Sequence, residues 1–220
     1  MRIVLLGAPG AGKGTQAKRL AEKYNMVHLS SGDILRAEKA SGSPLGRKVA
    51  TYMVAGKLVP DEVVVEIMAQ AVAAPRQASG LLLDGFPRTV PQAQALDAQL
   101  DRLGTPLDRV VMIDVSEDVV VDRICGRRSC PKCGAIYHVT HLPPKVAGRC
   151  DQCGYQGQFE QRDDDTEPVV RQRLGAYRKL TAPLLEYYRR VSPDKVLVVD
   201  GNRRPDEVTA ALVAKLAPAA

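Results

Sequence analysis

Aromatic residues are scarce in this 220-residue chain, which has no tryptophan and only two phenylalanines. A protein that holds single-stranded nucleic acid by base stacking interleaves aromatic side chains with basic ones. The shortage of aromatics therefore argues against a nucleic-acid partner, although the formal net charge of +6 indicates an anionic ligand. The positions of the arginines in the sequence are needed to identify this anionic ligand.

Long apolar runs are also missing. No stretch approaches the roughly 20 apolar residues that a membrane-spanning helix needs. The first ten residues hold only a short apolar run, and no cleavage-like site follows it. We therefore expect a soluble, cytoplasmic protein without a membrane partner.

Cysteine is limited to five residues, and four of them form two C-x-x-C pairs, Cys130/Cys133 and Cys150/Cys153. Without a secretory signal, such pairs favour metal binding over disulfides. The C-x₂-C-x₁₆-C-x₂-C spacing lets four thiolates close tetrahedrally on one Zn²⁺, which leaves no open position for chemistry. We expect a structural zinc site, with iron as the alternative metal. His138 and His141, between the pairs, are then ordinary residues.

Short apolar runs alternate with helical patterns along the chain. A strand followed by a helix, repeated in this way, predicts an α/β fold whose parallel sheet is covered on both faces, with ligands at the carboxyl ends of the strands. The first helix is predicted over Lys13–Tyr24, and a long one over 165–191 with bends near Pro168 and Pro183. The predicted strands cover 2–6, 27–29, 81–83, 110–113 and 196–199.

Two segments interrupt this alternation. Residues 30–59 read as short helices broken at Gly42-Ser43-Pro44 and at Gly56, and residues 128–161 are rich in Cys, Gly and Pro. We interpret both as insertions over the sheet. The core then comprises residues 1–29, 60–127 and 162–220.

A glycine-rich loop, Gly7-Ala8-Pro9-Gly10-Ala11-Gly12-Lys13-Gly14-Thr15, lies between the first strand and the first helix. Glycines let successive backbone N–H groups turn inward, and these donors cradle phosphate oxygens at the helix N-terminus. Lys13 supplies a mobile cation for the β/γ end. The common pattern places Ser or Thr directly after the lysine; here Gly14 intervenes before Thr15, which leaves the role of the hydroxyl toward Mg²⁺ open.

A second motif, Asp84-Gly85-Phe86-Pro87-Arg88, follows the predicted strand at 81–83. At the carboxyl end of a central strand, a carboxylate reaches Mg²⁺ through water and an arginine reaches phosphate. Alone, this motif could equally be a structural turn. Combined with the phosphate loop, it indicates a nucleotide site.

These motifs resemble those of the adenylate kinase family. Besides the phosphate loop, the resemblance includes Ser-Gly-Asp-Ile-Leu-Arg at 31–36, Asp-Gly-Phe-Pro-Arg-Thr at 84–89 and the arginine-bearing segments 122–128, 162–165 and 170–174. It implies a P-loop three-layer α/β/α fold with a central five-stranded parallel sheet. It further implies a helical AMP-binding insertion at 30–59, a lid at 128–161 that contains zinc, and usually a monomer. The implied reaction is ATP + AMP ⇌ 2 ADP with Mg²⁺.

The resemblance also implies site residues. Joining two polyanionic nucleotides requires many cations and no side-chain nucleophile. The implied ATP contacts are Gly10, Ala11, Gly12, Lys13, Gly14, Thr15, Arg123, Arg127, Ile136, Tyr137 and Arg203, and the implied AMP contacts are Ser31, Arg36, Lys57, Leu58, Val59, Gly85, Phe86, Pro87, Arg88, Gln92, Arg162 and Arg173. The implied catalytic residues are Lys13, Arg88, Arg127, Arg162 and Arg173, with Asp33 and Asp84 ordering the waters of Mg²⁺.

Two alternatives stay open. A kinase for another nucleoside monophosphate would share the same motifs, although Ser31, Val59 and Gln92 favour AMP, and the Gln92 amide can pair with a purine edge. A zinc-containing nucleic-acid ATPase would explain the charge and the cysteines but not the lack of aromatics. In either kinase, closure of the lid would exclude water from the γ-phosphate, and we expect lid opening to limit turnover.

Overall fold

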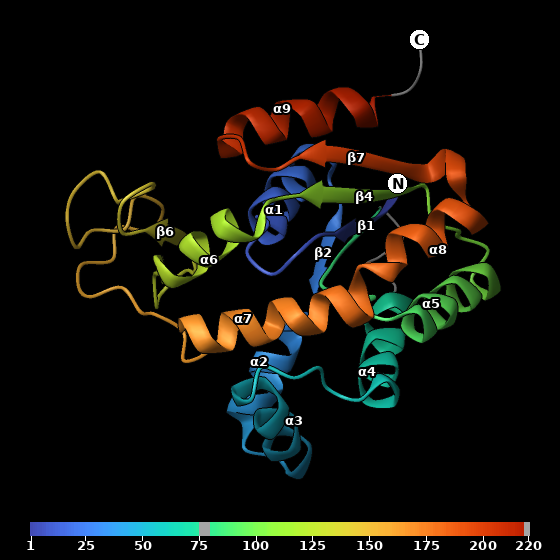
Figure 1. Cartoon of the computed structure of the whole chain (residues 1–220), viewed down its shortest axis with the longest axis horizontal. Coiled ribbons are helices and arrows are strands. Elements are labelled where there is room, and N and C mark those ends of the chain that lie inside the picture. Colours follow the sequence, from blue (N-terminus) through green and yellow to red (C-terminus); the bar gives the residue numbers. More distant parts are fainter. Residues whose placement is uncertain (75–79, 218–220) are drawn as a thin grey trace.

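The computed structural model describes residues 1–74 and 80–217. Its centre is a five-stranded parallel sheet in the order β2-β3-β1-β4-β7 (Figure 1). Each of the five predicted strands is present, and none differs from the prediction by more than one residue at either end. Their bounds are Arg2–Leu6 for β1, Val27–Ser30 for β2, Leu81–Asp84 for β3, Arg109–Asp114 for β4 and Val196–Asp200 for β7.

Helices cover both faces of the sheet because alternate residues of the central strand point to opposite sides. Ile3 and Leu5 pack with helices α1 (Lys13–Tyr24), α6 (Glu117–Cys125), α7 (Glu167–Ala176) and α9 (Pro205–Leu216). Val4 and Leu6 pack with α4 (Asp61–Ala73), α5 (Val90–Arg102) and α8 (Pro183–Val191). Each such side chain, when fully buried, contributes about 1.5–3 kcal/mol of transfer free energy. The predicted three-layer α/β/α architecture is confirmed.

The segment after β2 forms α2 (Ser31–Ser41) and α3 (Pro44–Val54), which project from the sheet at the bottom of Figure 1. They separate where the sequence predicted a break. Gly42 adopts the left-handed conformation, with φ 67°, and the Ser43 hydroxyl accepts a hydrogen bond of 2.8 Å from the backbone N–H of Gly46, which caps α3.

The predicted long helix at 165–191 is divided. Between α7 and α8 lies a π-helical turn, Tyr177–Thr181, in which the Ala182 N–H donates to the Tyr177 carbonyl at 2.8 Å. Pro183 has no N–H, and its ring would clash with the carbonyl four residues earlier in a regular helix, so the preceding turn widens. The ribbon nevertheless follows one continuous path past the sheet (Figure 1).

The segment at 128–161 lies beyond the end of α6, at the left of Figure 1. It includes most of an antiparallel hairpin, β5 (Arg127–Ser129) and β6 (Ile136–His138), which the sequence did not predict. In the described ranges, every helix is too short or too polar to cross a membrane.

Candidate functional site

A cleft of about 1480 Å³ opens at the carboxyl ends of the strands. It is lined by the phosphate loop, the end of β3, α2, the lid hairpin and α7. All the side chains predicted to bind nucleotide line it, with one exception. Phe86 is 2 % exposed and packs into the core beneath the cleft, so its part is to hold the turn after β3 in place.

The phosphate loop has the shape that its glycines allow. Gly10 has φ 78°, and a Cβ there would lie 2.7 Å from Cγ1 of Ile124 on α6, so the position accepts only glycine. Lys13 folds back over the loop, where its Nζ donates to the carbonyls of Gly7 and Ala8, both at 2.8 Å. Burial lowers the pKa of Lys13 to about 8, and the nearby Asp84 carboxylate opposes that fall.

Asp84 ends β3 and lies beside a partly buried imidazole. Nε2 of His28, on the neighbouring strand β2, is 3.7 Å from Oδ2 of Asp84. Among the described residues, this nitrogen has no hydrogen-bond partner. His28 could not be singled out from the sequence, because a lone histidine in a short strand gives no functional signal.

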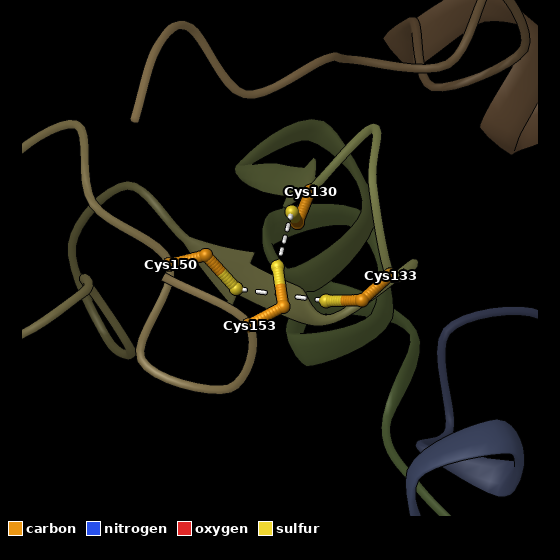
Figure 2. Close-up of side chains that lie close together, drawn as sticks. All are labelled: Cys130, Cys133, Cys150 and Cys153. Carbon is orange, nitrogen blue, oxygen red and sulfur yellow. Dashed lines mark hydrogen bonds between the residues drawn. The ribbon is translucent and has the colours of Figure 1, made fainter. Parts of the chain in front are cut away.

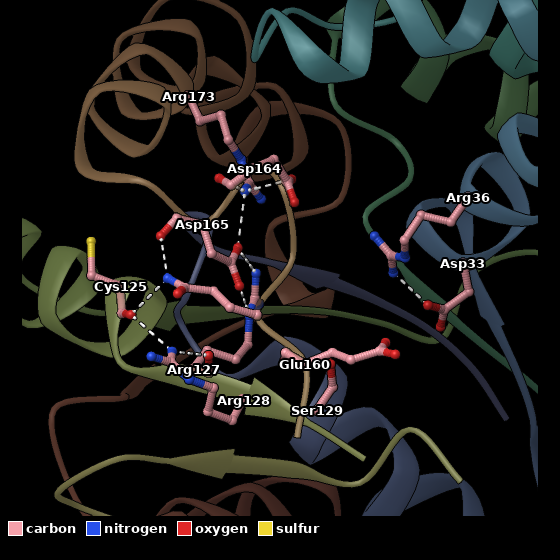
Figure 3. A network of polar contacts seen from close by, with 11 residues as sticks. Asp33, Arg36, Cys125, Arg127, Arg128, Ser129, Glu160, Asp164, Asp165 and Arg173 are labelled. Carbon is pink, nitrogen blue, oxygen red and sulfur yellow. Dashed lines mark hydrogen bonds and ion pairs between the residues drawn. The ribbon is translucent and has the colours of Figure 1, made fainter. Parts of the chain in front are cut away.

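Carboxylates hold several of the predicted site arginines (Figure 3). Arg127 Nε donates to Oδ2 of Asp165 at 2.7 Å, with a second contact between Arg127 and the other carboxylate oxygen. Arg173 donates to Asp164 at 2.9 Å, and Arg36 pairs with Asp33. Asp165 is only 1 % exposed, so its bidentate pair with Arg127 is screened little by solvent.

The other two predicted catalytic arginines experience a strongly positive environment. Burial, with a smaller contribution from the nearby Arg173, lowers the pKa of Arg88 to about 10. Burial also lowers the pKa of Arg162 to about 10, with Arg127 adding to the effect. Cations that are buried and repel one another are stabilised by a polyanion, so this arrangement suits phosphate groups.

Hydrogen bonds among α2, the turn after β3 and α5 hold the predicted AMP side together. The Ser31 hydroxyl donates to the Gly85 carbonyl at 2.6 Å, and Arg88 Nε donates to the same oxygen at 2.7 Å. The Gln92 amide accepts from the Arg88 N–H at 2.8 Å and donates to Asp61 at 2.7 Å. Gln92 has one remaining amide hydrogen for a base, so its pairing with a purine stays a prediction.

Asp61 was not singled out from the sequence. Its carboxylate accepts from Gln92 and, at 2.7 Å, from the Thr89 hydroxyl, so it fixes two residues beside the predicted acceptor site. Asp61 is the first residue of α4, where an acidic side chain is already favoured by the helix dipole, so nothing in the sequence indicated another role. Its contact with Gln92 on α5 forms only in the folded protein.

The four paired cysteines converge in the lid (Figure 2), as the sequence predicted. Cys130 Sγ lies 3.7 Å from Cys153 Sγ, and Cys133 Sγ lies 3.6 Å from Cys150 Sγ. Zn–S bonds of about 2.3 Å in a tetrahedron place sulfurs about 3.8 Å apart, whereas a disulfide requires about 2.05 Å. The donor set therefore fits Zn²⁺.

The cysteine pairs have the same local geometry. The Gly134 N–H donates to the Cys130 carbonyl and the Gly154 N–H donates to the Cys150 carbonyl, both at 2.9 Å. Both glycines adopt positive φ. Each C-x-x-C-Gly segment is thus a tight turn that presents two sulfurs to one point.

Asp122, His138 and His141 form a second group with closely spaced donor atoms. His138 Nδ1 accepts hydrogen bonds of 3.1 Å from the backbone N–H groups of Thr140 and His141, so the proton is on Nε2, which donates to the Asp122 carbonyl. A metal on Nε2 would move that proton to Nδ1, against two N–H donors. His138 is therefore a structural link between α6 and the lid.

Comparisons with known proteins agree with this geometry. The family model described as adenylate kinase matches residues 5–192. The adenylate kinase of Methanocella arvoryzae is 47% identical over 220 residues, which covers 99% of this chain and 100% of the relative. That of Agathobacter rectalis is 46% identical over 97% of this chain and 98% of its own, and that of Thermodesulfovibrio yellowstonii is 50% identical over 86% of each. The chain belongs to the adenylate kinase family.

Proposed function

We propose that this protein transfers the terminal phosphoryl group of ATP to AMP, reversibly and with Mg²⁺, to give two molecules of ADP. The supporting observation is the gathering of Lys13, Arg88, Arg127, Arg162 and Arg173 around one cleft at the phosphate loop. The reaction would balance the adenine nucleotides of the cytoplasm. The protein would act as a monomer on small molecules, without a nucleic-acid or membrane partner.

Charge and position supply the catalysis in this proposal. The phosphate-loop amides of residues 10–15 and Lys13 hold the ATP phosphates, while Arg123, Arg203 and Ile136 surround the nucleoside. Tyr137 borders the nucleoside from β6, although its ring packs toward the cysteines. Arg88, Arg127, Arg162 and Arg173 meet the charge that develops on the transferred group. Ser31, Arg36, residues 57–59, residues 85–87 and Gln92 orient AMP, so that its phosphate oxygen is in line for attack.

Asp33 and Asp84 are the residues that would hold Mg²⁺ through its waters. They lie on α2 and at the end of β3, both on the wall of the cleft. When bound, the ion would offset the negative charge of the phosphates. Asp33 pairs with Arg36 through Oδ1, and its exposed carboxylate keeps Oδ2 for the waters of the metal.

Zinc would have a structural part. The metal would join the turn at Cys130–Cys133 to the turn at Cys150–Cys153 and so order a segment too small for a core of its own. The first of these turns connects β5 to β6, which carry Arg127 and Ile136. Metal binding thus supports two predicted ATP contacts.

The proposal is tested by ADP formation from ATP and each nucleoside monophosphate in turn, on protein whose metal content has been measured. AMP should be by far the best acceptor, with one zinc per chain. Equal rates with CMP or UMP would move the assignment to a broader monophosphate kinase. Absence of transfer to any acceptor, together with salt-sensitive binding of DNA or RNA, would favour the nucleic-acid ATPase.

A further inference from the structure

Tyr137 lies between the cysteine cluster and the nucleotide cleft. It is the middle residue of β6, is 6 % exposed, and stacks on Phe159 with ring centroids 4.8 Å apart. Alternation along the strand directs it toward the cysteines. On the other side of the strand, His138 packs against Gly126, where a Cβ would come within 2.0 Å of Nε2.

The Tyr137 hydroxyl has two partners, both from the second cysteine turn. It accepts a hydrogen bond of 2.7 Å from the backbone N–H of Asp151 and donates to Cys150 Sγ at 3.4 Å. Because the N–H can only donate, the phenol proton is free for the sulfur.

We propose that Tyr137 is a positioning residue for the lid metal: its hydroxyl holds the Cys150 thiolate on Zn²⁺ and ties the second cysteine turn to strand β6. A hydrogen bond to a metal-bound thiolate spreads its negative charge and fixes its direction, and the loss of such a partner weakens metal binding. This inference rests on the zinc lid of the proposed function.

The connection matters for the hairpin. Cys130 follows β5 directly, and its N–H donates to the Ala135 carbonyl at 2.9 Å, so the first cysteine turn closes the hairpin. The second cysteine turn reaches the hairpin through the metal and through the Tyr137 hydroxyl. Tyr137 thereby makes the position of β6, at the wall of the cleft, depend on the metal.

The test compares Tyr137→Phe with Tyr155→Phe in the full-length protein. Tyr155 packs against the same cluster, but in the described part of the chain its hydroxyl makes no hydrogen bond. Zn²⁺ affinity is measured by competition with a chromogenic chelator, and Co²⁺ substitution reports the thiolate charge-transfer band. Tyr137→Phe should bind Zn²⁺ about 10- to 100-fold more weakly and shift the Co²⁺ band. Tyr155→Phe should match the wild type.

An affinity of Tyr137→Phe within twofold of the wild type, or an equal loss in Tyr155→Phe, would overturn the proposal. A phosphotransfer assay on the same zinc-loaded samples separates it from the proposed function. A wild type that binds Zn²⁺ but transfers nothing contradicts the kinase and leaves the Tyr137 comparison decisive. A wild type that takes up no Zn²⁺ overturns the zinc lid and the role of Tyr137 together, whatever the kinase assay shows.

Discussion

Arg88 has the surroundings of a group that meets charge in the transition state. Its Nε is fixed by the Gly85 carbonyl, and its backbone carbonyl accepts from the Thr181 hydroxyl at 2.8 Å. Hydrogen bonds thus hold both the backbone and the guanidinium of Arg88 in place before any nucleotide binds. Preorganised charge of this kind needs no rearrangement at the moment of transfer.

Replacement of Arg88 by lysine should reduce kcat by about 10²- to 10³-fold, because the charge remains but the planar fork of donors is lost. ADP production in a coupled assay measures the change. Arg190→Lys is the matched control, since Arg190 is exposed on α8. Full activity in Arg88→Lys would show that Arg88 does not stabilise the transition state.

We predict that the titration of Lys13 makes ATP binding depend on pH. Its pKa is lowered to about 8 in the free protein, so it is charged below pH 8 and loses its proton above it. Bound phosphates favour the charged form, and ATP affinity should therefore fall above pH 8 by up to about tenfold per pH unit, with proton uptake on binding. Calorimetry in buffers of different ionisation enthalpy measures both quantities.

The comparison for this pH effect is Lys13→Arg, whose guanidinium stays charged throughout the range. Its ATP affinity should be weaker than that of the wild type at pH 7 but nearly constant between pH 7 and 9. If the two proteins show the same pH profile, a group other than Lys13 titrates.

We expect the lid hairpin to be the element whose order depends most on the metal. Cys133→Ser should lose tight Zn²⁺ binding and lower Tm by several degrees, at about 2–4 °C for each kcal/mol lost. Metal analysis, differential scanning calorimetry and hydrogen exchange over residues 128–161 measure these effects. Cys125→Ala is the control, because Cys125 lies outside the cluster, on α6. A variant Cys133→Ser with wild-type metal content and Tm would contradict the structural role.

The sheet could be predicted from the sequence because each strand is a short apolar run between breakers. The hairpin β5–β6 could not: its strands have three residues each, too few for any periodicity, and its turn is set by Cys130 and Cys133. The π-helical turn was missed for a related reason, since Pro183 indicated a bend but not how the preceding turn would accommodate it.

The site was predictable where motifs place residues on one loop, as for Lys13 or Arg88. The partners of those residues were not. Asp61 reaches Gln92 across two helices, and Asp165 pairs with Arg127 only because the chain returns from the lid beside the hairpin. Such pairs depend on tertiary contacts between distant segments, which one sequence does not reveal.

For the whole molecule, the ion pair between the insertion at 30–59 and the segment that follows the lid is weak. Lys39 on α2 lies 3.4 Å from Asp163, two residues beyond the lid, and the aspartate side chain is 84% exposed. An exposed pair of this kind contributes about 0–1 kcal/mol. Breaking this ion pair therefore adds little to the free energy required for lid opening.

We predict that lid opening limits turnover. Relaxation dispersion on residues 128–161 during turnover should give an opening rate close to kcat, and Asp163→Asn should change both rates little. An opening rate far above kcat would mean that chemistry or another step is limiting.

Under the proposed function, Asp165 and Asp164 compete with the nucleotide phosphates for Arg127 and Arg173. A phosphate oxygen shares either arginine with Asp165 or Asp164, which already occupy part of its donors and offset part of its charge. The carboxylates therefore weaken binding of the phosphate. Release is favoured for the same reason, since each departing phosphate leaves an arginine that already has a replacement anion beside it. An enzyme that must free two product molecules in every cycle gains turnover from holding them less tightly.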